Sequence, residues 1–164
     1  TDSLLLTGNI GVIDAEYAEI LFDISGDGVI DNSDLELRLP RVPEITYGVG
    51  LIHELFLGDN EIISRVNFQY RDDFAYADDN RGFIQSINNL EANITWVTPI
   101  EGFSLSVYGR NLLDEVQACG DTQLPFGGPL SDGIGDPFGN APAAGTFSPL
   151  QRGRTLGVEA IFEF

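Results

Sequence analysis

The 164-residue sequence has no methionine, one cysteine and few basic residues. Its 8 Lys and Arg stand against 26 Asp and Glu, so the formal net charge is −18. We expect no nucleic-acid partner, because phosphate binding needs clusters of basic side chains. Cys119 cannot form a disulfide within the chain; it is either a free thiol or bonded to a residue outside this sequence. No disulfide framework therefore holds the fold together.

The sequence also lacks the residues of a catalytic centre. His53 is the only histidine, which excludes a histidine-dependent triad or a zinc site built from several histidines within this chain. The paired acids at 72–73 and 78–79 are expected in loops, without an apolar pocket that would raise a carboxyl pKa. We expect that the protein is not an enzyme, and we interpret His53 as a structural residue of a strand.

No apolar run approaches the roughly 18 to 20 residues that a membrane-spanning helix needs. The sequence instead alternates apolar and polar residues over strand-length segments, joined in turn by short turns and long polar connections. This pattern predicts an all-β, antiparallel up-and-down meander with two unlike ends. The six predicted strands are 3–17, 46–56, 61–74, 89–97, 103–113 and 152–164, and the long connections are 18–43, 75–88 and 114–151.

Alternation alone fits two structures, a half-solvated sheet of a soluble protein and the wall of a membrane β-barrel. It favours the soluble sheet, but the C-terminal segment favours the barrel. Apolar residues occupy every second position back from an aromatic final residue, although Ile161 breaks the alternation. This strand resembles the terminal strand that the barrel-assembly machinery recognises in bacterial outer-membrane proteins. Its apolar positions are Leu156, Val158, Ala160, Phe162 and Phe164.

Several short blocks, taken in order, resemble the C-terminal part of a TonB-dependent outer-membrane receptor. They extend across nearly the whole chain, and their order is more specific than any one of them. The blocks are Gly-Val-Ile-Asp-Ala-Glu-Tyr at 11–17, Leu-Pro-Arg-Val-Pro at 39–43, Tyr-Arg-Asp-Asp at 70–73, Asn-Leu-Leu-Asp-Glu at 111–115 and Pro-Leu-Gln-Arg-Gly-Arg at 149–154.

The resemblance implies that residues 1–164 are the last strands of a transmembrane barrel that has 22 strands in the full receptor. Six strands cannot close such a barrel, so we expect a fragment without the N-terminal plug. The implied location is the outer membrane of a Gram-negative bacterium, in contact with lipid, with 18–43 and 114–151 as long extracellular loops. The implied function is active uptake of a scarce, large solute such as a ferric siderophore, vitamin B12 or an oligosaccharide. TonB, ExbB and ExbD would act through the absent plug.

A calcium-like pattern lies in the first long connection. Oxygen-bearing positions recur at EF-hand spacing, with Gly28 at the sharp turn and Ile30 expected to pack inward. Pro40 and Pro43 make a long following helix doubtful. The pattern predicts either a structural Ca²⁺ site or an acidic loop without metal, and no other cofactor is required. The candidate ligands are Asp23, Ser25, Asp27, Val29 through its carbonyl, Asp31 and Asp34.

Arginines at three strand positions alternate with apolar residues, which predicts that they face a barrel lumen. Arg65, Arg71 and Arg110 are candidate contacts for a solute or the plug; pairing with Glu54 and Glu91 across strands is the alternative. Aromatic residues near strand ends are typical of a membrane-interface girdle, although ligand stacking is the alternative. They are Tyr70, Trp96, Phe103 and Tyr108.

A second function fits the acidity and the calcium-like pattern. The chain could be a secreted calcium-binding β-sheet module for adhesion or carbohydrate binding. The one-sided loop lengths and the aromatic terminal strand oppose this alternative.

Overall fold

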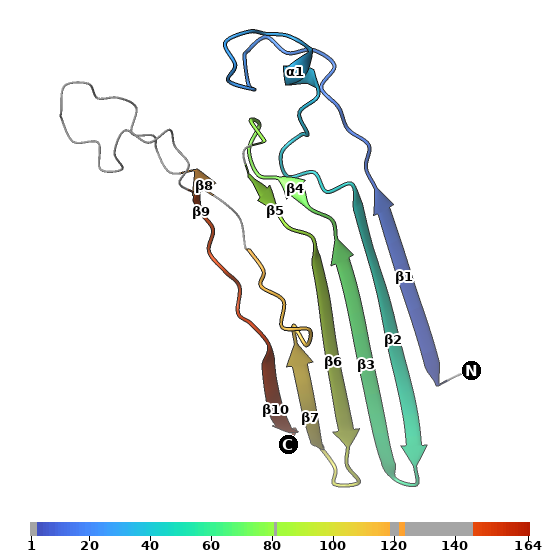
Figure 1. The fold of residues 1–164 in the computed structure, drawn as a ribbon. Coiled ribbons are helices and arrows are strands. Elements are labelled where there is room, and N and C mark those ends of the chain that lie inside the picture. Colours follow the sequence, from blue (N-terminus) through green and yellow to red (C-terminus); the bar gives the residue numbers. More distant parts are fainter. Residues whose placement is uncertain (1–2, 81, 119–121, 124–145) are drawn as a thin grey trace, which may run out of the picture.

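A computed structural model describes residues 3–80, 82–118, 122–123 and 146–164 (Figure 1). A six-stranded sheet in the order β1-β2-β3-β6-β7-β10 makes up most of it. No helix in these residues is long and apolar enough to cross a membrane. The sheet strands are β1 (Leu4–Val12), β2 (Ile45–Leu57), β3 (Asn60–Arg71), β6 (Ile87–Val97), β7 (Phe103–Arg110) and β10 (Thr155–Phe162).

Every neighbouring pair in this sheet is antiparallel. The short turns after β2 and β6 lie at one end of the sheet, together with both chain termini, and the three long connections leave from the other end (Figure 1). We call these the turn end and the loop end. The predicted all-β meander of six strands is therefore confirmed.

The long connections add short elements that the sequence did not predict. They are β4 (Phe74–Ala75) paired with β5 (Phe83–Ile84), β8 (Thr122–Gln123) paired with β9 (Thr146–Phe147), and the four-residue helix α1 (Asn32–Leu35). The helix ends before Pro40, as proline chemistry requires.

The predicted strand ends at the loop end were wrong by several residues. The segment 103–113 stops being strand at Arg110, because Asn111 takes a left-handed conformation with φ 48°. The Asn111 side chain then donates to the Glu115 carbonyl at 2.9 Å and accepts from the Glu115 N–H at 3.0 Å, closing a turn. Likewise, the predicted strand 3–17 ends at Val12, because β2 begins only at Ile45 and offers no partner beyond residue 13.

The strand register collects the apolar residues on one face of the sheet. Residues that pair directly share a face, so a row such as Leu6, Leu51 and Val66 runs across three strands. We call this surface the apolar face. Besides that row it includes Ile10, Val49, Phe68, Leu90, Ile94, Leu105, Val107, Val158 and Phe162.

The opposite surface is mostly polar, and we call it the polar face. Asn67, for example, pairs with Gly50 on one side and Glu91 on the other. The polar face includes Asn9, Thr46, Arg65, Gln69, Arg71, Asn89, Asn93, Ser106, Arg110 and Glu159.

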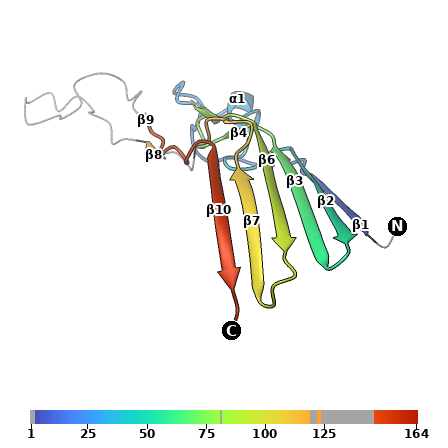
Figure 2. The same ribbon diagram turned by 90° about the horizontal axis from the view of Figure 1, so that it is seen from below.

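Neither face is covered by another layer of the described structure (Figure 2). Ile10 is 73% exposed and Val158 is 72% exposed, although both lie within regular strands. The buried hydrophobic residues of the described chain are Ala75, Tyr76 and Ile84, all in the connection between β3 and β6. The sheet itself thus has no hydrophobic core, and its apolar face needs a partner or an apolar solvent.

Tyr108 lies on the polar face, so the prediction that it belongs to a membrane-interface girdle was wrong. It pairs with Gly157 of β10, and a β-carbon built on Gly157 would lie 2.4 Å from Cζ of the Tyr108 ring. The ring therefore covers the space that a side chain at residue 157 would fill. Such an aromatic contact over a strand glycine fixes the register of neighbouring strands.

The Gly157→Ala substitution should destabilise the pairing of β7 with β10, because the tyrosine ring must move away. We expect a cost of about 1–3 kcal/mol, typical of overpacking, measured by thermal unfolding of the purified protein in detergent. Gly8→Ala is the matched control, since its β-carbon would meet only the Gly48 carbonyl at 3.8 Å. In a Tyr108→Ala background, which lacks the ring, adding Gly157→Ala should no longer carry this extra cost. Equal effects of the two glycine substitutions would contradict the contact.

Candidate functional site: the loop end and the polar face

The block 111–115 joins three strands at the loop end. The Leu112 N–H donates to the Leu90 carbonyl at 2.9 Å. The Glu115 carboxylate accepts from the backbone N–H and the side-chain amide of Asn88, both at 2.8 Å. The loop after β7 is thereby attached to β6, and the Asn111 turn described above sets its direction.

Asp114 attaches the same block to the segment before β10. Its carboxylate accepts from the Arg154 backbone N–H at 2.9 Å and pairs with the Arg154 guanidinium at 3.3 Å. The resemblance blocks 111–115 and 149–154 thus meet in space, although 40 residues separate Asp114 from Arg154. Cys119 and the segment 124–145 lie outside the described residues.

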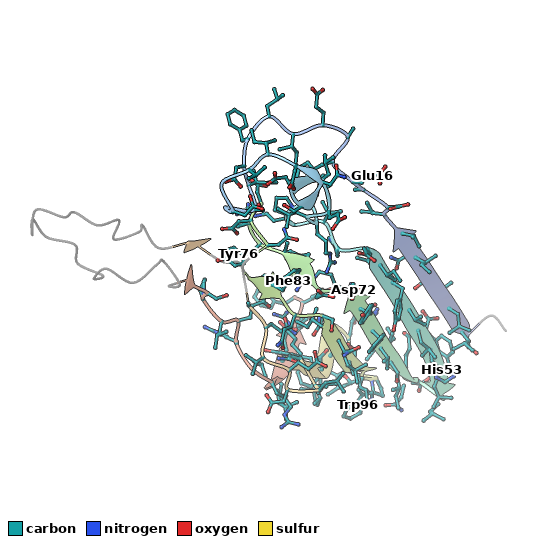
Figure 3. All side chains as sticks on the ribbon, turned by 45° about the horizontal axis from the view of Figure 1, so that its top comes forward. Glu16, His53, Asp72, Tyr76, Phe83 and Trp96 are labelled. Carbon is teal, nitrogen blue, oxygen red and sulfur yellow. The ribbon has the colours of Figure 1, made fainter. Side chains whose placement is uncertain are left out.

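Arg38 joins the other two long connections. Its guanidinium donates to the Asp73 carboxylate and to the Asp73 carbonyl, both at 2.9 Å, and lies 5.5 Å from the centre of the Phe83 ring. The Asn80 side chain accepts from the Arg38 N–H and donates to the Arg38 carbonyl, each at 2.8 Å. Figure 3 shows the loop-end residues Asp72, Tyr76 and Phe83 near one another and far from His53 and Trp96. No sequence pattern indicated Arg38 or Asn80, because their partners are distant in the chain.

The calcium-like segment folds around Asp34, which is 0% exposed. Its Oδ1 accepts from the backbone N–H groups of Ile24 at 2.9 Å and Ser25 at 2.8 Å, and its Oδ2 accepts from that of Asp31 at 3.0 Å. The last bond is half of a capping box at the start of α1. The carboxylate predicted as the final metal ligand is thus the hydrogen-bonding centre of the loop.

The other candidate ligands also bind backbone groups. Asp23 accepts from the Gly26 and Gly28 N–H groups at 2.7 and 2.8 Å and from the Ser25 hydroxyl at 3.2 Å; Asp27 accepts from the Val29 N–H at 2.8 Å. Asp31 accepts from the Ser33 N–H at 2.7 Å. Three or more metal-ligating side chains do not converge anywhere in the part of the chain that the structure describes.

Ile30 was expected to pack inward but is 54% exposed. The loop is closed by Asp34 instead of by an apolar side chain, which removes the reason for Ile30 to be buried. Calcium binding by Asp23, Ser25, Asp27, Val29, Asp31 and Asp34 stays a prediction. The carboxylates of the four aspartates in this set already accept hydrogen bonds from backbone amides, which fixes their orientation.

These hydrogen bonds lower the pKa of two aspartates. The Gly28 and Gly26 N–H groups hold the pKa of Asp23 below its usual range, and the N–H groups of Ser25 and Asp31 do the same for Asp34. A donated hydrogen bond favours the charged carboxylate. Above the pKa of the unfolded chain, both groups therefore stabilise the loop.

All three predicted lumen arginines lie on the polar face. Arg65 and Arg110 line one groove of about 440 Å³, together with the acids Glu91 and Glu159. Arg110 also lies 5.6 Å from the centre of the Tyr108 ring. The alternative pairing is not seen: among the described residues, no ion pair joins Arg65, Arg71 or Arg110 to Glu54 or Glu91. Contact with a solute or the plug stays a prediction.

Aromatic side chains lie near both ends of the apolar face. Towards the loop end, Tyr47 stacks on Tyr70 with ring centres 4.8 Å apart. Towards the turn end, the Trp96 indole N–H donates to the Asn60 side chain at 2.8 Å, and Phe103 lies 6.2 Å from Phe162. Two aromatic clusters thus border an aliphatic region.

The terminal-strand residues Leu156, Val158, Ala160 and Phe162 all share the apolar face, whereas Ile161 pairs with Ser104 on the polar face. The strand ends at Phe162, and the Phe162 and Phe164 rings lie 6.3 Å apart. His53, also on the apolar face, pairs with Leu4 and Ser64 and is part of the sheet surface.

Comparison with known proteins identifies a structural relative. No protein-family model and no curated protein sequence matches the chain. Among solved structures, the crystal structure of the ferric yersiniabactin uptake receptor FyuA from Yersinia pestis superposes with a TM-score of 0.63 over 80% of this chain, at 17% sequence identity. The sheet has the fold of a receptor β-barrel wall. The chain matches 18% of the length of FyuA, so its six strands are an open part of such a wall.

The Asp34→Asn substitution should loosen the calcium-like loop, because it weakens three hydrogen bonds from backbone amides. We expect exchange of the Ile24, Ser25 and Asp31 amides to become about tenfold faster, measured by hydrogen exchange with a calcium chelator present. Asp27→Asn is the control, since Asp27 accepts only the Val29 N–H in the described structure. If added Ca²⁺ slows exchange in the wild type but in neither variant, the loop binds metal. Exchange at wild-type rates in the Asp34 variant would refute the role of Asp34.

The lowered pKa values predict a pH dependence of the same loop. A depressed folded-state pKa stabilises the loop fully above the unfolded-state pKa of about 3.9. This stabilisation is lost as the pH falls through the lower, folded-state values. Carboxyl NMR of aspartate-labelled protein without calcium should show Asp23 and Asp34 titrating below the unfolded-state value. Titration of both groups at the ordinary pKa of an aspartate would contradict the hydrogen-bonding arrangement.

Proposed function

We propose that this chain is the C-terminal wall of a TonB-dependent receptor in the outer membrane of a Gram-negative bacterium. The full receptor would take up a scarce, large solute, for which a ferric siderophore, vitamin B12 or an oligosaccharide are the candidate classes. TonB, ExbB and ExbD would supply energy through a plug outside this chain. This chain would contribute wall strands and extracellular loops.

The uncovered apolar face is the observation that carries this proposal. A soluble sheet must bury such a face against a second layer, whereas lipid covers it in a membrane barrel. The alternative of a secreted calcium-binding adhesion module leaves the face without a partner. The buried core around Ala75 and Ile84 belongs to the loop end and cannot cover it.

The spacing of the two aromatic clusters supports the membrane interpretation. Trp96 is level with Ile62, eight residues along β3 from Tyr70. Eight residues span roughly 26 Å of strand at about 3.3 Å each. At a strand tilt of about 40°, this is roughly 20 Å along the membrane normal, close to the ~25 Å apolar band of outer-membrane barrels. The aliphatic residues between the clusters would contact lipid tails.

The direction of the strands supports the location of the loops. Short turns face the periplasm and long connections face outward in outer-membrane barrels. The connections 18–43 and 114–151 would then be extracellular, with the calcium-like loop at the cell surface. The apolar terminal strand would span the membrane with its end near Phe164 on the periplasmic side, and the barrel-assembly machinery would recognise it.

A surface-labelling experiment tests both location and orientation. An epitope inserted between Leu21 and Phe22 should bind antibody on intact source cells, whereas the same epitope at Glu101, in the turn after β6, should bind only after permeabilisation. Fractionation should give a heat-modifiable outer-membrane band larger than 17.8 kDa. A soluble or secreted band near that mass would overturn the proposal. Surface exposure of the Glu101 epitope would overturn the orientation.

A further inference from the structure

A second groove, of about 470 Å³, lies on the polar face beside the loop end. Strands β1, β2, β3 and β6 form its floor, with Asn9, Gln69 and Asn89 among the lining side chains. Its other side is made by Gln117 and Gln151, which belong to the two arms of the connection between β7 and β10. We call it the loop-end groove.

Two hydrogen-bond donors of the loop-end groove are buried without an acceptor. Gln117 is 8% exposed, and its side-chain Nε2 has no partner. The Nε of Arg71 is likewise buried and unpartnered. They are the two such side-chain atoms of the described residues. Because buried donors are nearly always satisfied, both atoms call for an acceptor that the described residues do not supply.

The Arg71 side chain and the Gln117 backbone are held in place by other contacts. The Arg71 guanidinium lies 4.7 Å from the centre of the Phe74 ring, and its Nη2 donates to the Gln85 carbonyl at 3.3 Å. The backbone carbonyl of Gln117 accepts from the Gln151 backbone N–H at 2.7 Å, which joins the two arms beside the groove and fixes the position of residue 117. The Arg71 donor and the Gln117 backbone are therefore arranged before any ligand arrives, which lowers the entropic cost of binding.

The charge of the loop-end groove differs from that of its surroundings. Arg71 is its one charged lining residue, although the chain carries 26 acidic residues. The groove of Arg65 and Arg110, in contrast, also contains Glu91 and Glu159, which offset the arginines. A cation and unpaired N–H donors without a nearby acid are the features of a site for a carboxylate or a similar oxyanion.

We infer that the loop-end groove binds a carboxylate group of a ligand, which accepts hydrogen bonds from Arg71 Nε and Gln117 Nε2. If the proposed function is right, that ligand is the transported solute, and the groove selects solutes that bear such a group. The binding site itself depends only on the residues that line it. Arg71, predicted as a lumen contact, thereby acquires a specific role, and Gln117 is added to it.

Trifluoroacetate is a small carboxylate whose binding can be followed by ¹⁹F NMR. The full-length protein that contains this chain, in detergent, should broaden its resonance saturably. Acetate should displace it, whereas methylammonium, a cation of similar size, should not. Absence of broadening by the wild type, or equal displacement by both competitors, would overturn the inference.

Two variants locate the binding to the loop-end groove. Arg71→Met and Gln117→Glu should each weaken trifluoroacetate binding by about tenfold or more, because each removes a donor to a charged group. Arg41→Met, which removes a cation from an exposed loop position, should bind as the wild type does. Equal loss in the Arg41 variant would show non-specific attraction. Heat-modifiability of each variant reports whether its barrel is intact.

Failure of this inference can be separated from failure of the proposed function. A protein that is found in the outer membrane with surface-exposed loops but does not bind the probe refutes the carboxylate site alone. A protein that binds the probe through Arg71 and Gln117 but is recovered as a soluble species refutes the receptor proposal and leaves the site.

Discussion

The structure depends on one constraint, the antiparallel register that places most of the large aliphatic residues of six strands on the same face. A shift of one residue in any pair would move a whole strand's apolar side chains to the opposite face. The glycine contact of Tyr108 and the turns at both ends hold this register. Because the apolar face needs an apolar partner or solvent, covering it favours this register over its alternatives.

The loop end follows from the same constraint. Since the strands have no core to share with their connections, the connections must be stabilised by their own contacts. They use charged and amide side chains for this: Arg38 with Asp73, Asn80 with the Arg38 backbone, and Asp114 with Arg154. The first two contacts join the connection between β1 and β2 to the connection between β3 and β6, and the third joins the two ends of the connection between β7 and β10. Order at the loop end thus comes from polar bonds between distant residues, with a small apolar cluster around Ala75 and Ile84.

The six strands, their faces and the side of the long loops were predictable from the sequence, because a period of two residues is a local signal. The ends of the strands were not predictable. The alternation of apolar and polar residues continues through Leu112, but hydrogen bonds between the Asn111 side chain and the Glu115 backbone turn the chain before that point. The motif spacing drew attention to Asp34, but the direction of its carboxylate toward backbone amides depends on the folded loop. No sequence pattern indicated Gln117, because its buried side-chain Nε2 without a hydrogen-bond acceptor is visible only in the folded structure.

The distribution of charge limits what the loop-end groove can accept. The described residues of the connections 13–44, 72–86 and 111–154 include 15 acidic and 4 basic side chains, so they carry a charge of 4 − 15 = −11 out of the net −18, and most of the net charge lies at this end. Such a field attracts cations and repels anions over about 8 Å at physiological ionic strength. Arg71 and Gln117, however, require an acceptor. A ligand that meets both conditions carries a carboxylate without a large negative net charge, as zwitterions and carboxylate complexes of metal cations do.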